Sequence, residues 1–320
     1  MPRHAGPRID SVCRLNRLVR APNILAMLIS EQINQYHEDG FTLIEGAVPA
    51  DLLEQLCRGT DEIVAAARGL TSSDERYDLE DNHTPDSPKV RRLKSPFLHW
   101  PLFADLVRES CILDAVEDLI GHDLRLYNHK VNIKAPEYGA AVEWHQDWAF
   151  YPHTNDDGLA VGIYLDDVTP ENGPMMILPG SHKGPVYDHH SGGYFCGAMD
   201  PTACDLDFSQ AVPLMGPAGT MTLHHVRAIH GSDLNTSAQP RRFVIQGYFA
   251  ADAWPLEGYI KNFDLAAFDA KMVRGNPTSA PRLADVPVRM PLPEALNPGS
   301  IYENQNTLEH RYFATYEDVA

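Results

Sequence analysis

The clearest chemical signal in the chain is the segment WHQDW, in which a histidine and an aspartate are separated by one residue. On a strand or an extended segment, side chains two positions apart point to the same side, so His145 and Asp147 can converge on one point. Two histidines and one carboxylate form the triad that holds iron(II) in mononuclear non-haem oxygenases and leaves neighbouring coordination positions open. His145 and Asp147 supply two of these three ligands, so the third must come from elsewhere.

His230 is the candidate for the third ligand. It begins the segment HGSDLNTS, 85 residues beyond His145, and Arg241 follows 11 residues later. A guanidinium suits a bidentate pair with a carboxylate, so Arg241 is placed to bind the far end of a dicarboxylate that chelates the metal, and Ser232 can donate to the same carboxylate. HxD alone is a weak motif, whereas its combination with HGS and a following arginine indicates a metal site.

The elements that must position these residues are mainly strands. From Asp123 to about Ala250, short alternating or β-branched runs are separated by turn-rich pieces, which predicts a sandwich or barrel. Upstream of this region, helical spacing dominates and a strand is expected only in FTLIEGAV. We expect helices over 30–37 with Ser30 as N-cap, 49–69, 101–109 and 112–120. The fold class is therefore mainly β with flanking helices.

Three segments lie outside this pattern. Residues 71–90 are polar and acidic, so we expect a loop that borders the site, and whether it forms a lid stays open. Residues from about 252 to 320 are rich in proline and predict a C-terminal wrap of little regular structure. Residues 1–26 carry five arginines against one acid, which fits a disordered leader, an extension from an upstream start codon or a targeting segment. We expect one catalytic domain over 27–320, with its barrel core at about 123–250.

Composition limits the partners. The 320 residues include 44 acidic and 26 basic side chains, so the net charge of -18 repels phosphate backbones and anionic lipids. We therefore expect neither nucleic acid nor a membrane as partner. Five cysteines without CxxC spacing and the absence of a long apolar segment favour a reducing, cytoplasmic location. The oligomeric state is left open.

The chain resembles the phytanoyl-CoA dioxygenase family, which includes ectoine hydroxylase, from about Met27 to Ala253. The resemblance rests on WHQDWAFYP, ENGPMMILPGSHKG and HGSDLNTSAQPRRFVIQGYFA. It implies a double-stranded β-helix, a jelly-roll barrel of the cupin type with helices packed on one side. It also implies that His145, Asp147 and His230 bind iron(II), that Arg241 binds 2-oxoglutarate, and that Asn132 and Lys130 contact this co-substrate.

The reaction implied by the resemblance uses 2-oxoglutarate and O2 to hydroxylate an unactivated C–H bond of a small-molecule substrate, giving succinate and CO2. Trp148 and Tyr151 follow the ligand pair and are candidates for substrate contact, although aromatic packing explains them as well. Arg92 can bind an anionic substrate or form a surface ion pair. Of the adjacent His224 and His225, at most one can point into the barrel.

Two alternatives stay open. A cupin-type enzyme that works with zinc or manganese and without 2-oxoglutarate explains the barrel and the histidines but gives Arg241 no role. A non-catalytic small-molecule-binding barrel predicts ligand binding without formation of succinate. No motif identifies the substrate.

Overall fold

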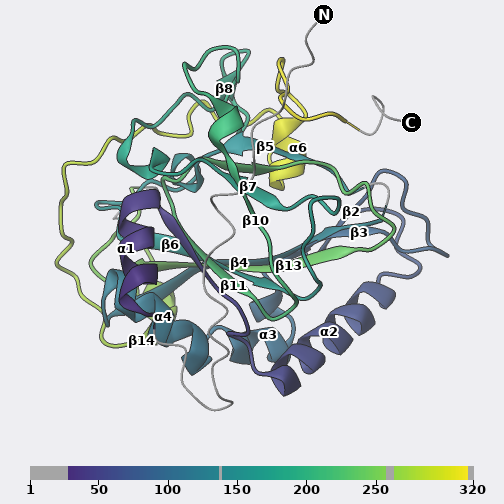
Figure 1. The fold of residues 1–320 in the computed structure, drawn as a ribbon, viewed down its shortest axis with the longest axis horizontal. Helices are drawn as coiled ribbons and strands as arrows, with labels where there is room; N and C mark the ends of the chain where they lie inside the picture. The colour runs from purple at the N-terminus through teal and green to yellow at the C-terminus, as the bar shows by residue number, and fades with distance from the viewer. Residues whose placement is uncertain (1–27, 137–138, 257–262, 316–320) are drawn as a thin grey trace, which may run out of the picture.

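The computed structural model describes residues 28–136, 139–256 and 263–315. The predicted leader at 1–26 lies outside the described residues. Within them, two antiparallel sheets face each other, and helices cover the outer side of the larger one (Figure 1). This arrangement confirms the predicted fold class of mainly β structure with flanking helices.

The larger sheet has eight strands. Its order is β1-β11-β6-β13-β4-β3-β2, with β14 paired to β4 off this path. The central pair is the longest, because β13 and β4 pair from Arg241 opposite Lys134 to Ala250 opposite Leu124. The strands are β1 (Phe41–Ile44), β2 (Tyr77–Leu79), β3 (Val90–Lys94), β4 (Leu124–Lys134), β6 (Gly158–Tyr164), β11 (Met221–His225), β13 (Arg241–Ala250) and β14 (Met272–Arg274).

The smaller sheet has four strands in the order β10-β7-β12-β5. An apolar cluster that includes Tyr164, Met175, Ile177 and Phe243 joins its inner face to the larger sheet. The strands are β5 (Val142–His145), β7 (Met175–Ile177), β10 (Val212–Leu214) and β12 (His230–Ser232), while β8 (His190–Ser191) and β9 (Tyr194–Phe195) form a separate hairpin. Two facing antiparallel sheets of this kind are the jelly roll that we predicted.

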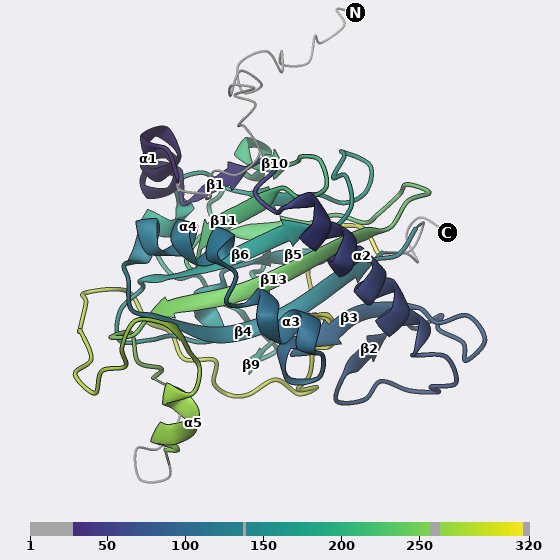
Figure 2. The same cartoon turned by 90° about the horizontal axis from the view of Figure 1, so that it is seen from below.

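Four helices cover the outer face of the larger sheet, as the sequence predicts. They are α1 (Ser30–Asp39), α2 (Ala50–Ala65), α3 (Pro101–Leu106) and α4 (Ser110–Ile120). Figure 2 shows α2, α3 and α4 lying across the strands. The main core lies between these layers, where Val131 of β4 packs with Leu56 of α2 and Phe103 of α3. Because successive side chains of a strand point to opposite faces, the neighbours of Val131 on β4 point inward, toward the second sheet.

Two local predictions need correction. The polar segment 71–90 is mostly irregular, as expected, but it also contains β2, which pairs antiparallel with β3 and extends the large sheet. Ser30 was expected to cap the first helix; it is the first helical residue instead, and the amide of Ile29 donates to Gln32 Oε1 at 3.0 Å. In both places, polar residues suggested a loop or a cap, whereas the backbone N–H groups there donate to partners in the folded chain.

The segment after β13 is mostly irregular. It contains α5 (Leu265–Asp269), β14 and α6 (Ile301–Gln305). The last of these, α6, lies against β5 and brings Ile301 and Tyr302 to the space between the sheets. In the described parts of the chain, no helix is both long and apolar enough to cross a membrane.

The core under β3 gives a test of this packing. Leu93 is fully buried, and Leu93→Ala should lower the free energy of unfolding by about 2–5 kcal/mol because it leaves a cavity. Leu98 is 68% exposed, so Leu98→Ala should change this free energy by less than about 0.5 kcal/mol. Urea unfolding followed by circular dichroism measures both. Equal effects of the two substitutions would contradict the packing described for β3.

A candidate metal centre between the sheets

The predicted ligands converge between the two sheets. His145 ends β5, His230 begins β12, and the two residues are direct cross-strand partners with ring centroids 4.1 Å apart. One potential ligand atom from each of His145, Asp147 and His230 lies within 4.8 Å of the others, and all three residues are buried. Asp147 is not on the strand; it begins the 3-10 turn η2 (Asp147–Ala149). The chain bends after His145, yet both side chains reach the same point.

Backbone carbonyls orient both imidazoles. His145 Nδ1 donates to the carbonyl of Glu143 at 2.8 Å, and His230 Nδ1 donates to the carbonyl of Ala228 at 2.9 Å. Since a carbonyl can only accept, the proton is on Nδ1 and the Nε2 lone pair of each ring is free for a metal. Burial lowers the pKa of His145 to about 4 and that of His230 well below its ordinary value. Both rings are therefore neutral at pH 7, as metal ligands must be.

Gln146, between two of the ligands, fixes their spacing. Its side-chain amide donates to the carbonyls of Pro185 at 3.1 Å and Arg227 at 2.9 Å, and its Oε1 accepts from the Tyr187 amide at 2.9 Å. Its own backbone N–H donates to His189 Nε2 at 2.9 Å. Four bonds from one fully buried residue hold the turn that carries His145 and Asp147. In the sequence, Gln146 is marked only by its position as a polar residue between two ligands, so its role was not predicted.

The Asp147 carboxylate lies among cationic and imidazole groups. Burial alone would raise its pKa, but Lys130 and the neighbouring histidines hold the pKa well below the ordinary value. His224 Nε2 is 3.7 Å from Asp147 Oδ2, too far for a hydrogen bond, and within the described residues neither ring nitrogen of His224 has a hydrogen-bond partner. His224 lines the cavity while its neighbour His225 does not, which confirms that only one of the pair points inward.

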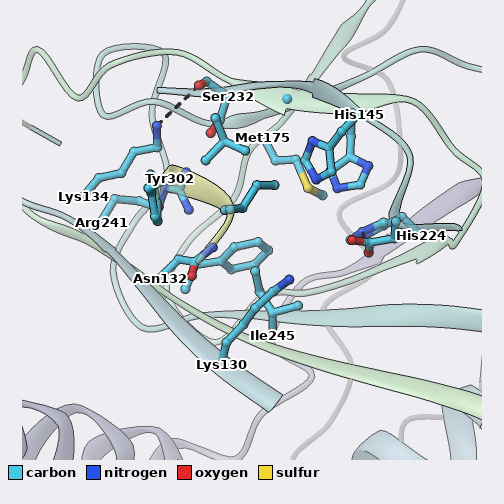
Figure 3. A pocket seen from close by; sticks show the side chains of 16 residues that line it. Lys130, Asn132, Lys134, His145, Met175, His224, Ser232, Arg241, Ile245 and Tyr302 are labelled. Atoms are coloured by element: carbon cyan, nitrogen blue, oxygen red, sulfur yellow. Dashed lines mark hydrogen bonds and ion pairs between the residues drawn. The ribbon is translucent and has the colours of Figure 1, made fainter. Parts of the chain in front are cut away.

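A cavity extends from the triad along the inner face of β4 and β13. Figure 3 shows His145 and His224 toward one end, Lys134, Arg241 and Tyr302 at the other, and Lys130 between them on the wall formed by β4. Its lining surrounds about 520 Å³ of empty space, counting the part open to solvent. Its lining includes four residues predicted from the sequence beyond the triad, namely Lys130, Asn132, Ser232 and Arg241.

The end of the cavity away from the triad carries two buried cations. Arg241 Nη2 donates to the Gly173 carbonyl at 2.6 Å, while its Nε is buried with no partner among the described residues. Lys134 Nζ donates to the carbonyls of Ala140 at 2.7 Å and Asp233, with a longer contact of 3.4 Å to that of Ser232. Burial lowers the pKa of both groups, and the Arg241 charge lowers the pKa of Lys134 further. A carboxylate placed here would stabilise both charges.

Trp148 and Tyr151 have different surroundings. Trp148 is fully buried in a separate apolar cluster, and its indole N–H donates to the Pro287 carbonyl at 2.8 Å, which favours the packing alternative for this residue. Burial and the Asp147 carboxylate raise the pKa of the Tyr151 hydroxyl well above its ordinary value, which places this hydroxyl near the triad. Arg92, expected just before a helix, lies in β3 directly opposite Asn132 of β4. Lys134, His224 and Tyr302 are cavity residues that sequence reasoning did not assign.

The donor set fits iron(II). Two neutral imidazole nitrogens and one ionised carboxylate, converging from one side, are the ligands of a facial triad and leave the opposite side open toward the cavity. The same donors can bind other divalent ions, because affinity follows ligand type and geometry together. The triad thus supports a metal centre, and the cavity beside it supports an anionic ligand.

The chain is similar to known oxygenases in sequence and in fold. The phytanoyl-CoA dioxygenase family model matches residues 36–243. A Stutzerimonas stutzeri protein described as a probable alpha-ketoglutarate-dependent hypophosphite dioxygenase is 41% identical over 290 residues, 89% of this chain and 100% of that protein. The L-proline trans-4-hydroxylase of Streptomyces griseoviridis is 39% identical over 165 residues, 45% of this chain and 62% of that protein. The crystal structure of EctD from S. alaskensis with 2-oxoglutarate and 5-hydroxyectoine has a TM-score of 0.62 at 24% identity, covering 88% of this chain and 94% of that one.

Metal binding should stabilise the fold through the triad. Iron(II) added anaerobically at about 100 times its dissociation constant should stabilise the folded chain by about 2.7 kcal/mol, measured as a rise in the thermal midpoint. His230→Ala removes one of three ligands and should abolish this rise. His310→Ala, at an exposed histidine paired with Asp200, should leave it unchanged. A rise of the same size in His230→Ala would show that the metal binds elsewhere.

Proposed function

Because the chain belongs to the phytanoyl-CoA dioxygenase family, we propose that His145, Asp147 and His230 hold the iron(II) of a 2-oxoglutarate-dependent dioxygenase. The observation that carries this assignment is the convergence of three buried ligand atoms at one end of a cavity that has a buried, incompletely bonded arginine at the other. The triad fits the metal, and the arginine fits the co-substrate. The enzyme class follows from the family, and the residue roles are our proposal.

Arg241 would hold the distal carboxylate of 2-oxoglutarate. Its free Nε lies in the cavity wall, and the Gly173 carbonyl fixes one side of its guanidinium, so little side-chain entropy is lost when a carboxylate binds. Lys134 adds a second positive charge at the same end, held in place by carbonyl groups. Ser232 lines the cavity there and would donate its hydroxyl to the same carboxylate. Asn132, whose buried Oδ1 has no partner among the described residues, would contact the co-substrate from β4.

With iron(II), 2-oxoglutarate and O2 bound, the chemistry supplied is oxidative decarboxylation to succinate and CO2 coupled to hydroxylation of the substrate. The protein's own residues prepare this chemistry. The carbonyl-bound Nδ1 protons keep His145 and His230 in the metal-binding tautomer, and Gln146 holds the turn that carries Asp147. The apolar walls formed by Val142, Met175 and Ile245 limit the entry of water around the reacting groups.

The rival functions account for fewer of these features. A cupin-type enzyme without 2-oxoglutarate leaves Arg241 and Lys134 without a ligand for their buried charges. A non-catalytic barrel does not require three ligands whose tautomers and spacing are fixed by separate hydrogen bonds. Release of succinate that depends on both iron(II) and 2-oxoglutarate would exclude both rivals.

The substrate is a small molecule. The names of the relatives span hypophosphite, L-proline and ectoine, which differ in size and charge. We further propose a cytoplasmic location, because Cys57, Cys111, Cys196 and Cys204 are all free thiols. The net charge of -18 supports our proposal that neither nucleic acid nor a membrane is a partner.

Arg241→Ala should weaken binding of 2-oxoglutarate at least tenfold, because the distal carboxylate loses its charged hydrogen-bond partner. The measurement is an anaerobic titration of the iron(II) protein with 2-oxoglutarate, followed by the weak visible charge-transfer band of the complex. Arg241→Lys keeps the charge but not the planar fork and should give an intermediate affinity. An unchanged titration in Arg241→Ala would remove Arg241 from the co-substrate site.

Asp147→Ala provides the complementary control. It removes the carboxylate ligand and should abolish release of succinate under air. Retained activity in Asp147→Ala with iron(II) and 2-oxoglutarate would contradict the ligand assignment.

A further inference from the structure

Two cations near the triad, Lys130 and Arg92, make no hydrogen bond or ion pair within the described residues. Lys130 of β4 lines the cavity, and Arg92 of β3 lies next to it, opposite Asn132. Both side chains are half-buried, and neither makes a hydrogen bond or ion pair with any residue in 28–136, 139–256 or 263–315. The other cations of this region are all bonded, since Lys134 and Arg241 donate to carbonyls and Arg91 donates to Asp78 at 3.0 Å. A charged group that lines a cavity and lacks a protein partner can be neutralised by an oppositely charged ligand.

The strand register puts Lys130 apart from the co-substrate end, with Arg92 beside it and opposite Asn132. Side chains of Asn128, Lys130, Asn132 and Lys134 alternate with core residues along β4 and share its inner face. Lys134 is opposite Arg241, whereas Lys130 is four residues away and opposite Ile245, about 13 Å along the strand. Asp147 and Arg92 are the charged groups that act on the Lys130 ammonium. Lys130 therefore belongs to the part of the cavity nearer the triad, and Arg92 lies behind the lining beside it, where Tyr302, Asp78 and Asp147 all act on its charge.

The same part of the cavity lacks a free carboxylate. Among the described residues that line it, Asp147 is the only acid, and the metal would use its charge. Asp78, the partner of Arg92 on β2, is bonded to Arg91 instead. An amino-acid substrate would bring an ammonium group that no acid here could neutralise, and that Lys130 and Arg92 would repel. Polar neutral groups are present, because the Tyr151 hydroxyl and the Asn128 amide meet beside Asp147.

We infer that Lys130 and Arg92 form a substrate site for a small oxyanion without a positive group, held beside the metal with its oxidisable hydrogen toward the triad. This inference rests on the proposed function and assigns Lys130 to the substrate rather than to 2-oxoglutarate. Phosphorus oxyanions that carry a P–H bond fit this site, since two cations neutralise their oxygens and a compact anion fills little space. The hypophosphite named for the Stutzerimonas stutzeri relative is an anion of this class.

The oxidation of hypophosphite balances in atoms and electrons. One P–H bond of the substrate becomes P–OH, giving phosphite, while the C1–C2 bond of 2-oxoglutarate breaks to release CO2 and succinate. One oxygen atom of O2 enters phosphite and the other enters the new carboxylate of succinate. Two electrons come from the P–H bond and two from 2-oxoglutarate, so no further reductant is needed.

To test this inference, hypophosphite is titrated under anaerobic conditions into protein already loaded with iron(II) and 2-oxoglutarate. Binding is measured by the change in the visible charge-transfer band and by the heat released. Lys130→Met and Arg92→Met should each weaken hypophosphite binding at least tenfold while the affinity for 2-oxoglutarate changes less than twofold. Methylphosphonate, an oxyanion with C–H bonds, tests whether the site accepts the wider class. L-proline, a zwitterion, should bind the wild type at least tenfold more weakly than hypophosphite.

Lys94→Met is the matched control. Lys94 is the cross-strand partner of Lys130, but its Nζ donates to the Asp74 carbonyl at 2.9 Å, away from the cavity. This variant loses the same charge from the same sheet and should bind hypophosphite like the wild type. Lys130→Arg should recover most of the affinity lost in Lys130→Met, which a purely structural role of Lys130 would not require.

The possible results distinguish a failure of the proposed function from a failure of the anion site. A wild-type protein that forms no band with iron(II) and 2-oxoglutarate would overturn the proposed function. A normal band combined with unchanged hypophosphite affinity in both variants, or with no hypophosphite binding at all, would overturn the anion site alone. Tighter binding of L-proline than of hypophosphite, or an equal loss of 2-oxoglutarate affinity in the variants, would also overturn it.

Discussion

The site depends on one cross-strand pair, His145 of β5 opposite His230 of β12. Residues 85 positions apart in sequence become neighbours only because these strands pair in this register, and a slip of one residue would turn one imidazole to the other face. Gly231 permits the close approach of the strands. A Cβ at this position would lie 3.0 Å from the Val142 carbonyl oxygen and 3.2 Å from the Trp144 amide nitrogen, so any side chain would push β12 away from β5. The close approach of β12 and β5 therefore sets the distance between the two histidine ligands.

Charge is distributed unevenly in the molecule. The chain carries a net charge of -18, yet the inner wall of the large sheet presents Lys130, Lys134 and Arg241 to the cavity, with Asp147 as the one acid among its described lining residues. Such a cavity concentrates anions from a surface that otherwise repels them. Two kinds of cation occur there. Lys134 and Arg241 are held by backbone carbonyls, and Lys130 and Arg92 have no acceptor within the described residues. The side chains of Lys134 and Arg241 are therefore held in place before a ligand binds, whereas Lys130 and Arg92 would find their acceptor in the ligand.

The sequence predicts the metal ligands better than their surroundings. His145, Asp147, His230 and Arg241 are recognisable because their types and spacing match one chemistry, and the strands around them follow from alternation. Gln146 and Lys134 could not be assigned, since their partners are backbone carbonyls that come near only in the folded chain. The two explanations for Trp148 stayed open because positions after β5 do not keep strand geometry once η2 begins. Polar composition likewise concealed β2, whose hydrogen bonds are made with β3.

The alternation along β4 links the two halves of the cavity. Four polar side chains, two amides and two ammonium groups, occupy successive inward positions on one strand, while β13 opposes them with Arg241, Phe243 and Ile245. The apolar Phe243 and Ile245 thus separate the arginine that faces the co-substrate from the region near the triad. Because strand geometry fixes this separation, exchanging the residues around Lys130 would change which substrate is neutralised without moving Arg241. A rigid co-substrate end and an unpaired cationic end on the same strand allow one oxidising centre to serve different small substrates.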